Sequence, residues 1–285
     1  MRGLPVNLYL IAAFERLLCE PAVPGRQKEQ ELQDFLERHT ELIPTPNLLN
    51  HHLHFEAVVS KFPLGTELTT DYVYITKSSD TWRITLVELE APDKHLFTSD
   101  LKKATPSSEF NAALNQVRRW KDFIDDNPGE VTRRLEPLLQ PQQQNPIEFH
   151  YLLIIGRSEN KNASRERQKL FRRLSRESGI EVLTYDQLLS WYRNGERYTK
   201  LVLRLAGFQY AFKYMHLFPT QILAYVGPDR LAISANDRAR LVAAGYEMDK
   251  WSQGEPLMYN IKLARSTLEQ DIRDGTIFNR QDPSI

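Results

Sequence analysis

Two apolar runs separated by a short polar turn constrain the fold of this 285-residue chain more than any other feature. The runs cover residues 70–75 and 82–92, both rich in β-branched and aromatic residues, and the turn covers residues 77–80. This pattern predicts an antiparallel β-hairpin. Because side chains alternate along a strand, Glu88 and Glu90 are expected on one face, together with Trp82, Ile84 and Leu86.

Three carboxylates gather at the open end of this hairpin. If the turn centres near residues 78–79, Asp71 lies opposite Glu88 or one diagonal away, with Cβ atoms roughly 5–8 Å apart. Two carboxylates at that separation can share a hard divalent cation. Three such groups repel one another unless a cation or a proton intervenes. The pattern therefore predicts a metal site formed by Asp71, Glu88 and Glu90.

The remaining segments predict an α/β fold, in which a mixed β-sheet is flanked by helices. The expected helices cover residues 6–20, 27–39, 108–125, 164–178 and 185–192. The expected strands besides the hairpin cover residues 54–62, 149–156 and 180–184. The order strand, helix, strand after residue 149 predicts a right-handed crossover that adds parallel strands to the hairpin sheet. The proline- and glutamine-rich residues 127–148 are interpreted as an excursion without packed structure.

These elements suggest three parts in the chain. Residues 1–26 form an N-terminal helical segment, residues 27–198 the main domain, and residues 199–285 a small C-terminal α+β extension or subdomain. A terminal helix is expected over residues 259–273. In the helix at 27–39, the periodicity places Leu32, Phe35 and Leu36 on the buried face and exposes Glu29, Asp34 and Glu37.

The amino-acid composition places few limits on the function and location of the protein. Lys+Arg and Asp+Glu both number 37, so any nucleic-acid site must come from local clustering of charge. The single cysteine, Cys19, excludes an internal disulfide, fits a reducing compartment and favours a cytoplasmic location. The apolar run at residues 8–14 is too short to span a bilayer, so no membrane association is expected.

A basic helix face is the strongest nucleic-acid signal. Arg165, Lys169, Arg172 and Arg176 recur at helical spacing along the segment 164–178. A continuous row of cations suits a phosphate backbone, and Arg119 near Gln116 would extend it. The alternative is an ordinary solvated helix exterior.

The order of these elements resembles the PD-(D/E)XK nuclease superfamily and, within it, the Shedu antiphage defence nucleases. The resemblance covers roughly residues 27–195. Its motifs are Val-Glu-Leu-Glu-Ala-Pro at 87–92, Ala-x-x-x-Gln-x-x-x-Trp at 112–120, Ile-Gly-Arg at 155–157 and Leu-Thr-Tyr-Asp-Gln-Leu at 183–188.

This resemblance implies a restriction-endonuclease-like core and a metal-dependent DNA endonuclease, or nickase, of bacterial antiviral defence. It makes Asp71 and Glu88 ligands of Mg²⁺, with Mn²⁺ as a substitute. Glu37, or alternatively Glu41, would orient the attacking water, and Gln116 would position the phosphate or the water. DNA is the implied partner, and the protein is expected to form a homo-oligomer.

The sequence departs from the superfamily at Glu90, where lysine is usual. Glu90 could be a further metal ligand, or another lysine, such as Lys94, Lys102 or Lys103, could reach the site. Alternatively, the site is catalytically impaired and the protein is a nucleic-acid-binding or sensor module. A structural α/β interaction module without any nucleic-acid role is the third interpretation.

Overall fold

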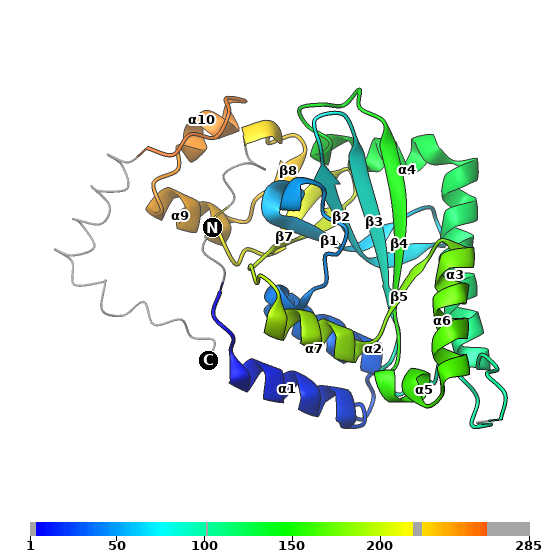
Figure 1. The fold of residues 1–285 in the computed structure, drawn as a ribbon. Coiled ribbons are helices and arrows are strands. Elements are labelled where there is room, and N and C mark those ends of the chain that lie inside the picture. The colour runs from blue at the N-terminus through cyan, green and yellow to red at the C-terminus, as the bar shows by residue number, and fades with distance from the viewer. Residues whose placement is uncertain (1–3, 101, 219–223, 261–285) are drawn as a thin grey trace.

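A computed structural model describes residues 4–100, 102–218 and 224–260 of the chain (Figure 1). These residues form one eight-stranded mixed sheet with the strand order β5-β4-β3-β2-β1-β6-β7-β8. The strands are β1 (Ala57–Pro63), β2 (Thr69–Lys77), β3 (Trp82–Leu89), β4 (Ile147–Ile154), β5 (Glu181–Leu183), β6 (Leu201–Ala206), β7 (Gln209–Tyr214) and β8 (Leu231–Ala232). The predicted α/β class, with a mixed sheet flanked by helices, is confirmed.

Helices cover both faces of this sheet (Figure 1). In the described residues they are α1 (Leu8–Cys19), α2 (Lys28–Arg38), α3 (Ser108–Asp126), α4 (Pro128–Leu135), α5 (Ser158–Asn162), α6 (Arg165–Ser178), α7 (Tyr185–Asn194), α9 (Ala235–Ala243) and α10 (Met248–Ser252). None of the helices in these segments is long and apolar enough to cross a membrane.

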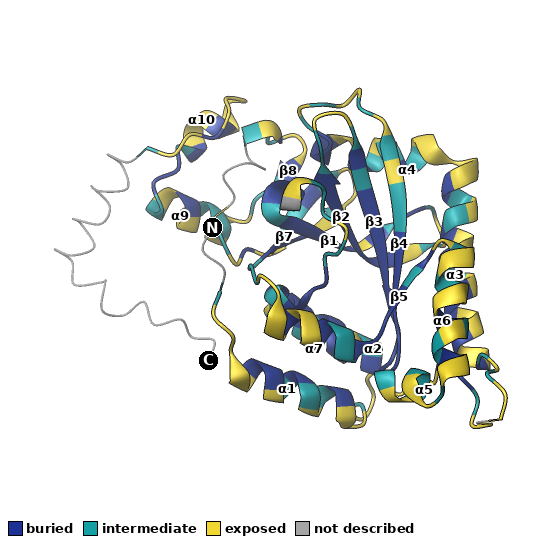
Figure 2. Cartoon of the chain, viewed as in Figure 1, coloured by how far each residue is buried: buried dark blue, intermediate teal, exposed yellow. Residues whose placement is uncertain are grey.

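The predicted hairpin is confirmed, because β2 and β3 pair antiparallel around the polar turn. The alternation of its side chains separates two apolar clusters. Ile84 and Leu86 point to the cluster under α3, α4 and α6, whereas Tyr72 and Val87 point to the cluster under α1, α2 and α7. Both strands of the hairpin, β2 and β3, are buried along most of their length, as the dark colour in Figure 2 shows. The sheet therefore forms the centre of the molecule and fixes the position of every side chain on the hairpin.

The predicted crossover is also confirmed. Strand β4 pairs parallel with β3 and β5 pairs parallel with β4, with α5 and α6 between the two strands in the sequence. The helix α6 begins with Ser164, whose side chain accepts a hydrogen bond from the Arg167 amide, and ends at Gly179 in the left-handed region with φ 67°.

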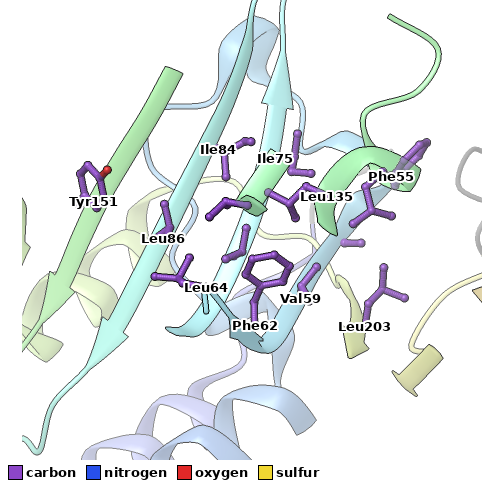
Figure 3. Packing of buried hydrophobic residues seen from close by; sticks show 14 of the residues in the cluster. Phe55, Val59, Phe62, Leu64, Ile75, Ile84, Leu86, Leu135, Tyr151 and Leu203 are labelled. Atoms are coloured by element: carbon purple, nitrogen blue, oxygen red, sulfur yellow. The ribbon is translucent and has the colours of Figure 1, made fainter. Parts of the chain in front are cut away.

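Two predictions about local structure are wrong. The strand expected from residue 54 begins at Ala57, because residues 54–56 form a 3₁₀ turn in which Phe55 has φ 57°. The segment 127–148 is not an unpacked excursion. It begins with the helix α4, whose Val131 and Leu135 enter the cluster under α3, and Figure 3 shows Leu135 among its side chains. Proline at the first turn of α4 is compatible with a helix, since the amides of that turn have no partner within the helix.

The C-terminal region continues the same sheet. Strand β6 pairs parallel with β1, β7 pairs antiparallel with β6, and β8 pairs parallel with β7. The strands β6, β7 and β8 therefore extend the sheet beyond β1. The helix expected over residues 259–273 lies almost wholly outside the described residues.

Candidate functional site

The open end of the β2–β3 hairpin brings Asp71 and Glu88 together. Tyr72 pairs with Val87, so the next step of the register sets Asp71 opposite Glu88. Both side chains are buried. One carboxylate oxygen of Asp71, Oδ2, accepts a hydrogen bond of 2.7 Å from the Leu89 amide, which fixes the Asp71 side chain beside β3.

Glu88 has the most perturbed carboxyl group in this site. Burial, followed by the charges of Asp71 and Glu90, raises the pKa of Glu88 to about 10. The Gln116 side chain, from α3, donates a hydrogen bond to Oε1 of Glu88. This environment favours the protonated form of Glu88, and a bound cation would favour the ionised form.

Two lysines contact the other two carboxylates. Lys61, on β1, donates to Oδ1 of Asp71. Lys94 donates to Glu90 and also lies 3.1 Å from Oε1 of Glu29 on α2. Burial raises the pKa of Glu90, and its hydrogen bond with Lys94 opposes that rise.

The charge of Lys94 is retained in this arrangement. Burial lowers the pKa of Lys94, but the hydrogen bonds with Glu90 and Glu29 outweigh burial and raise it overall. Lys94 is thus the lysine that the structure brings to Glu90, whereas Lys102 and Lys103 are exposed on the loop before α3.

Glu37 is not exposed, which corrects the prediction from the periodicity of its helix. Its relative exposure is 0%. The Ser60 hydroxyl donates to its Oε1 at 2.5 Å, the Gln33 amide donates to the same atom at 3.3 Å, and the Lys213 ammonium lies 2.6 Å from Oε2. The prediction failed because a carboxylate is buried only with partners, and Lys213 is remote in the sequence.

Glu37 is connected to the hairpin through Gln33. The Gln33 Nε2 atom also lies 3.5 Å from the backbone carbonyl of Asp71 and 3.2 Å from Ser60 Oγ, so its two hydrogens are shared among these two oxygens and Oε1 of Glu37. The alternative residue Glu41 lies elsewhere, on a cavity of about 480 Å³ beside α7. Of the two candidates, Glu37 is the one that the structure links to Asp71.

The exposed cations of α6 lie as expected. Arg165, Lys169, Arg172 and Arg176, here called the α6 basic face, are all exposed, as is Arg119 on α3. The two helices run side by side (Figure 1), and the rings of Phe110 on α3 and Phe171 on α6 stack with centroids 6.3 Å apart.

The sequence patterns do not indicate four residues that contact the carboxylates of this site, namely Lys61, Ser60, Gln33 and Lys213. Lys61 could have been found by extending the pairing from the hairpin to the preceding strand, since it falls opposite Asp71. Gln33 lies four residues before Glu37, the spacing of neighbours on a helix face. Nothing in the local sequence indicates Lys213.

The side chains of this site do not form a complete set of protein ligands for a metal ion. Within the described segments, no group of three or more His, Cys, Asp or Glu side chains is placed to hold a metal ion. Mg²⁺, however, commonly binds proteins through one or two carboxylates and takes its other ligands from water and substrate phosphates. Asp71 and Glu88 supply two carboxylates of this kind.

The fold and site define an α/β protein whose central hairpin carries a buried pair of acidic residues, with lysines beside them. The family model described as Shedu protein SduA, C-terminal, matches residues 26–189, and the chain belongs to this family. The resemblance to the Shedu family noted from the motifs is thereby confirmed, and family membership points to antiphage defence. No curated protein matches the chain.

Proposed function

We propose that this protein is a metal-dependent DNA endonuclease that nicks DNA in bacterial antiviral defence. Its central part would be a restriction-endonuclease-like core of the PD-(D/E)XK superfamily. The observation that carries this proposal is the buried pair of Asp71 and Glu88 on paired strands. Burying two carboxylates beside each other is costly for stability alone, and perturbed carboxyl groups of this kind concentrate at functional sites.

The chemistry of this pair fits Mg²⁺, or Mn²⁺ in its place. Both residues offer carboxylate oxygens, which are the ligands that these hard cations prefer. Burial and the charges of Asp71 and Glu90 raise the pKa of Glu88, and a bound cation would offset both effects. When bound, the metal would activate water and stabilise negative charge on the phosphate.

The neighbouring residues have distinct roles in this proposal. Gln116 donates to Glu88 and so fixes the direction of its carboxyl group. Lys94, held by Glu90 and Glu29, supplies the positive charge that the superfamily places at position 90. Glu90 is then the residue that positions this lysine and, in the presence of metal, would be a further ligand.

DNA binding is assigned to the α6 basic face and Arg119. These side chains are exposed on two adjacent helices, and α3 also carries Gln116. A row of cations on neighbouring helices can follow a phosphate backbone without reading its sequence. A cytoplasmic location and homo-oligomerisation belong to the same proposal.

A second candidate function is binding of nucleic acid without cleavage. It is favoured by the lysines that already contact Asp71 and Glu90, because a salt bridge can satisfy a carboxylate in place of a metal. In this alternative the acidic hairpin is only structural, and the α6 basic face carries the function.

Cleavage of supercoiled plasmid separates the two candidates. The purified protein is incubated with plasmid and Mg²⁺ or Mn²⁺, alongside Asp71→Ala, Glu88→Ala and the control Glu15→Ala. The control alters a partly exposed carboxylate on α1 that pairs with Arg193. The endonuclease proposal expects nicked circles with wild type and control, and none with the two site variants or with chelator. Retained DNA binding with no nicking under either metal would favour the second candidate.

A further inference from the structure

The carboxylate of Glu37 is fully buried, and the structure supplies it with one cation. Lys213 Nζ lies 2.6 Å from Oε2 of Glu37, and no other ion pair to Glu37 occurs among the described residues. The other oxygen accepts hydrogen bonds from Ser60 and Gln33. A buried carboxylate without a countercharge is strongly destabilising, so Lys213 makes the burial of Glu37 tolerable.

This cation comes from outside the segment that matches the family model. Lys213 lies on β7, whereas the match ends at residue 189. The chain after β7 adds a second contact, because Nε2 of His216 lies 2.7 Å from the backbone carbonyl of Glu37. Two contacts from residues 213–216 thus hold the C-terminal turn of α2 against the sheet.

The same network reaches the candidate metal ligand by two paths. Gln33, bonded to Glu37, also donates to the backbone carbonyl of Asp71. Ser60, bonded to Glu37, directly precedes Lys61, whose side chain contacts the carboxylate of Asp71. The position of Asp71 therefore depends on groups that Glu37 orders.

We infer that Lys213 is a positioning residue of the candidate active site, and that β7 is an integral part of that site. Lys213 holds Glu37 in its charged, hydrogen-bonded arrangement, and Glu37 in turn orders Gln33, Ser60 and Asp71. The effect on cleavage rests on the proposed endonuclease function. The effect on the position of Asp71 does not depend on that function.

The test compares four variants of the full chain. Lys213→Met removes the charge and keeps the length of the side chain, and Lys213→Arg keeps the charge. Glu37→Gln and the double variant Lys213→Met/Glu37→Gln remove the need for a countercharge. Lys250→Met is the matched control, because Lys250 forms an ion pair of 2.9 Å with Glu247 on the surface of α10.

Two readouts are measured, plasmid nicking and hydrogen exchange of the Leu89 amide, which donates to the Asp71 carboxylate. Lys213→Met is expected to lower nicking at least about tenfold, to lower Tm by roughly 5 °C or more, and to speed Leu89 exchange above that of other sheet amides. Lys213→Arg and the control should behave as wild type. The double variant should be no less stable than Glu37→Gln alone.

The inference is overturned if Lys213→Met leaves both nicking and Leu89 exchange unchanged. It is also overturned if the variant speeds all sheet amides equally and the double variant shows no recovery of stability, since Lys213 would then contribute only general stability. If the wild type never nicks DNA, the proposed function fails, whereas Leu89 exchange still decides the role of Lys213.

Discussion

Replacing Glu88 with Gln tests the electrostatics of the hairpin most directly. Burial and the neighbouring charges of Asp71 and Glu90 raise the pKa of Glu88 to about 10, whereas in the unfolded chain it is near 4.5. A raised carboxyl pKa stabilises the folded state most at low pH, and this contribution is lost as the pH rises from the unfolded to the folded value. Glutamine resembles the protonated acid and does not titrate, so Glu88→Gln removes this pH dependence.

The size of this pH dependence follows from the difference in protons bound by the folded and unfolded states. Between pH 5 and pH 9, the free energy of unfolding of the wild type should fall relative to Glu88→Gln by up to about 1.4 kcal/mol per pH unit. From pH 6 to pH 8 the difference is up to about 3 kcal/mol. In the presence of chelator, the variant should therefore be close to the wild type at pH 5 and more stable at pH 8.

Urea denaturation at pH 5, 6, 7 and 8, with EDTA throughout, measures this difference. Glu15→Gln provides the control, since the partly exposed Glu15 on α1 pairs with Arg193 at the surface and should show little pH-dependent difference over this range. A difference between wild type and Glu88→Gln that stays constant across the four pH values would refute the reasoning. The result would mean that Glu88 titrates normally in the folded protein.

Adding Mn²⁺ to the same experiment tests the metal proposal. A metal that binds only the folded state stabilises it, and it must displace the proton from Glu88. The wild type should therefore gain stability from Mn²⁺, and the gain should grow from pH 6 to pH 8. Glu88→Gln should gain little at any pH, and an equal gain in both proteins would place the metal elsewhere.

Three further predictions concern the surroundings of the site. Changing all four residues of the α6 basic face to serine should weaken DNA binding and reduce the slope of log K against log salt by about 3–4, measured by fluorescence anisotropy at several salt concentrations. An unchanged slope would exclude this face as the DNA-binding surface. Gly156→Ala should lower the free energy of unfolding, measured by urea denaturation, by about 1–3 kcal/mol, because Gly156 has φ 64° and a Cβ there would collide with the Lys94 carbonyl. An unchanged free energy of unfolding would contradict this prediction. Lys61→Met should remove the cation from Asp71 and strengthen Mn²⁺ binding measured by calorimetry, whereas weaker binding would show that Lys61 supports the metal site.

The hairpin and its acidic residues could be predicted because the information is local. Alternating apolar residues on both sides of a short turn determine the register, and the register determines that Asp71 faces Glu88. The crossover from β4 to β5 was predictable for the same reason, since each element carries its own periodicity.

The network around Glu37 could not be predicted, because its parts come from segments far apart in the chain. The burial of Glu37 depends on Ser60 and Lys213, and single-sequence periodicity treats every glutamate as exposed. The helix α4 was missed for a different reason. The prolines of residues 127–148 and the glutamines after the helix suggested a loop, although Val131 and Leu135 have the spacing of one helix face.

The pairing of β1 with β6 has a consequence for the synthesis of this protein. Ala57 pairs with Leu201, so the edge of β1 that does not pair with β2 stays open until residue 201 has emerged from the ribosome. Pairing across so long a loop is slow, and the strands that follow, including the one with Lys213, join later still. A nascent chain that ends before β6 thus contains the acidic hairpin but not the cation that neutralises Glu37. On the proposed function, cleavage would require that residues up to Lys213 have been synthesised and have joined the sheet.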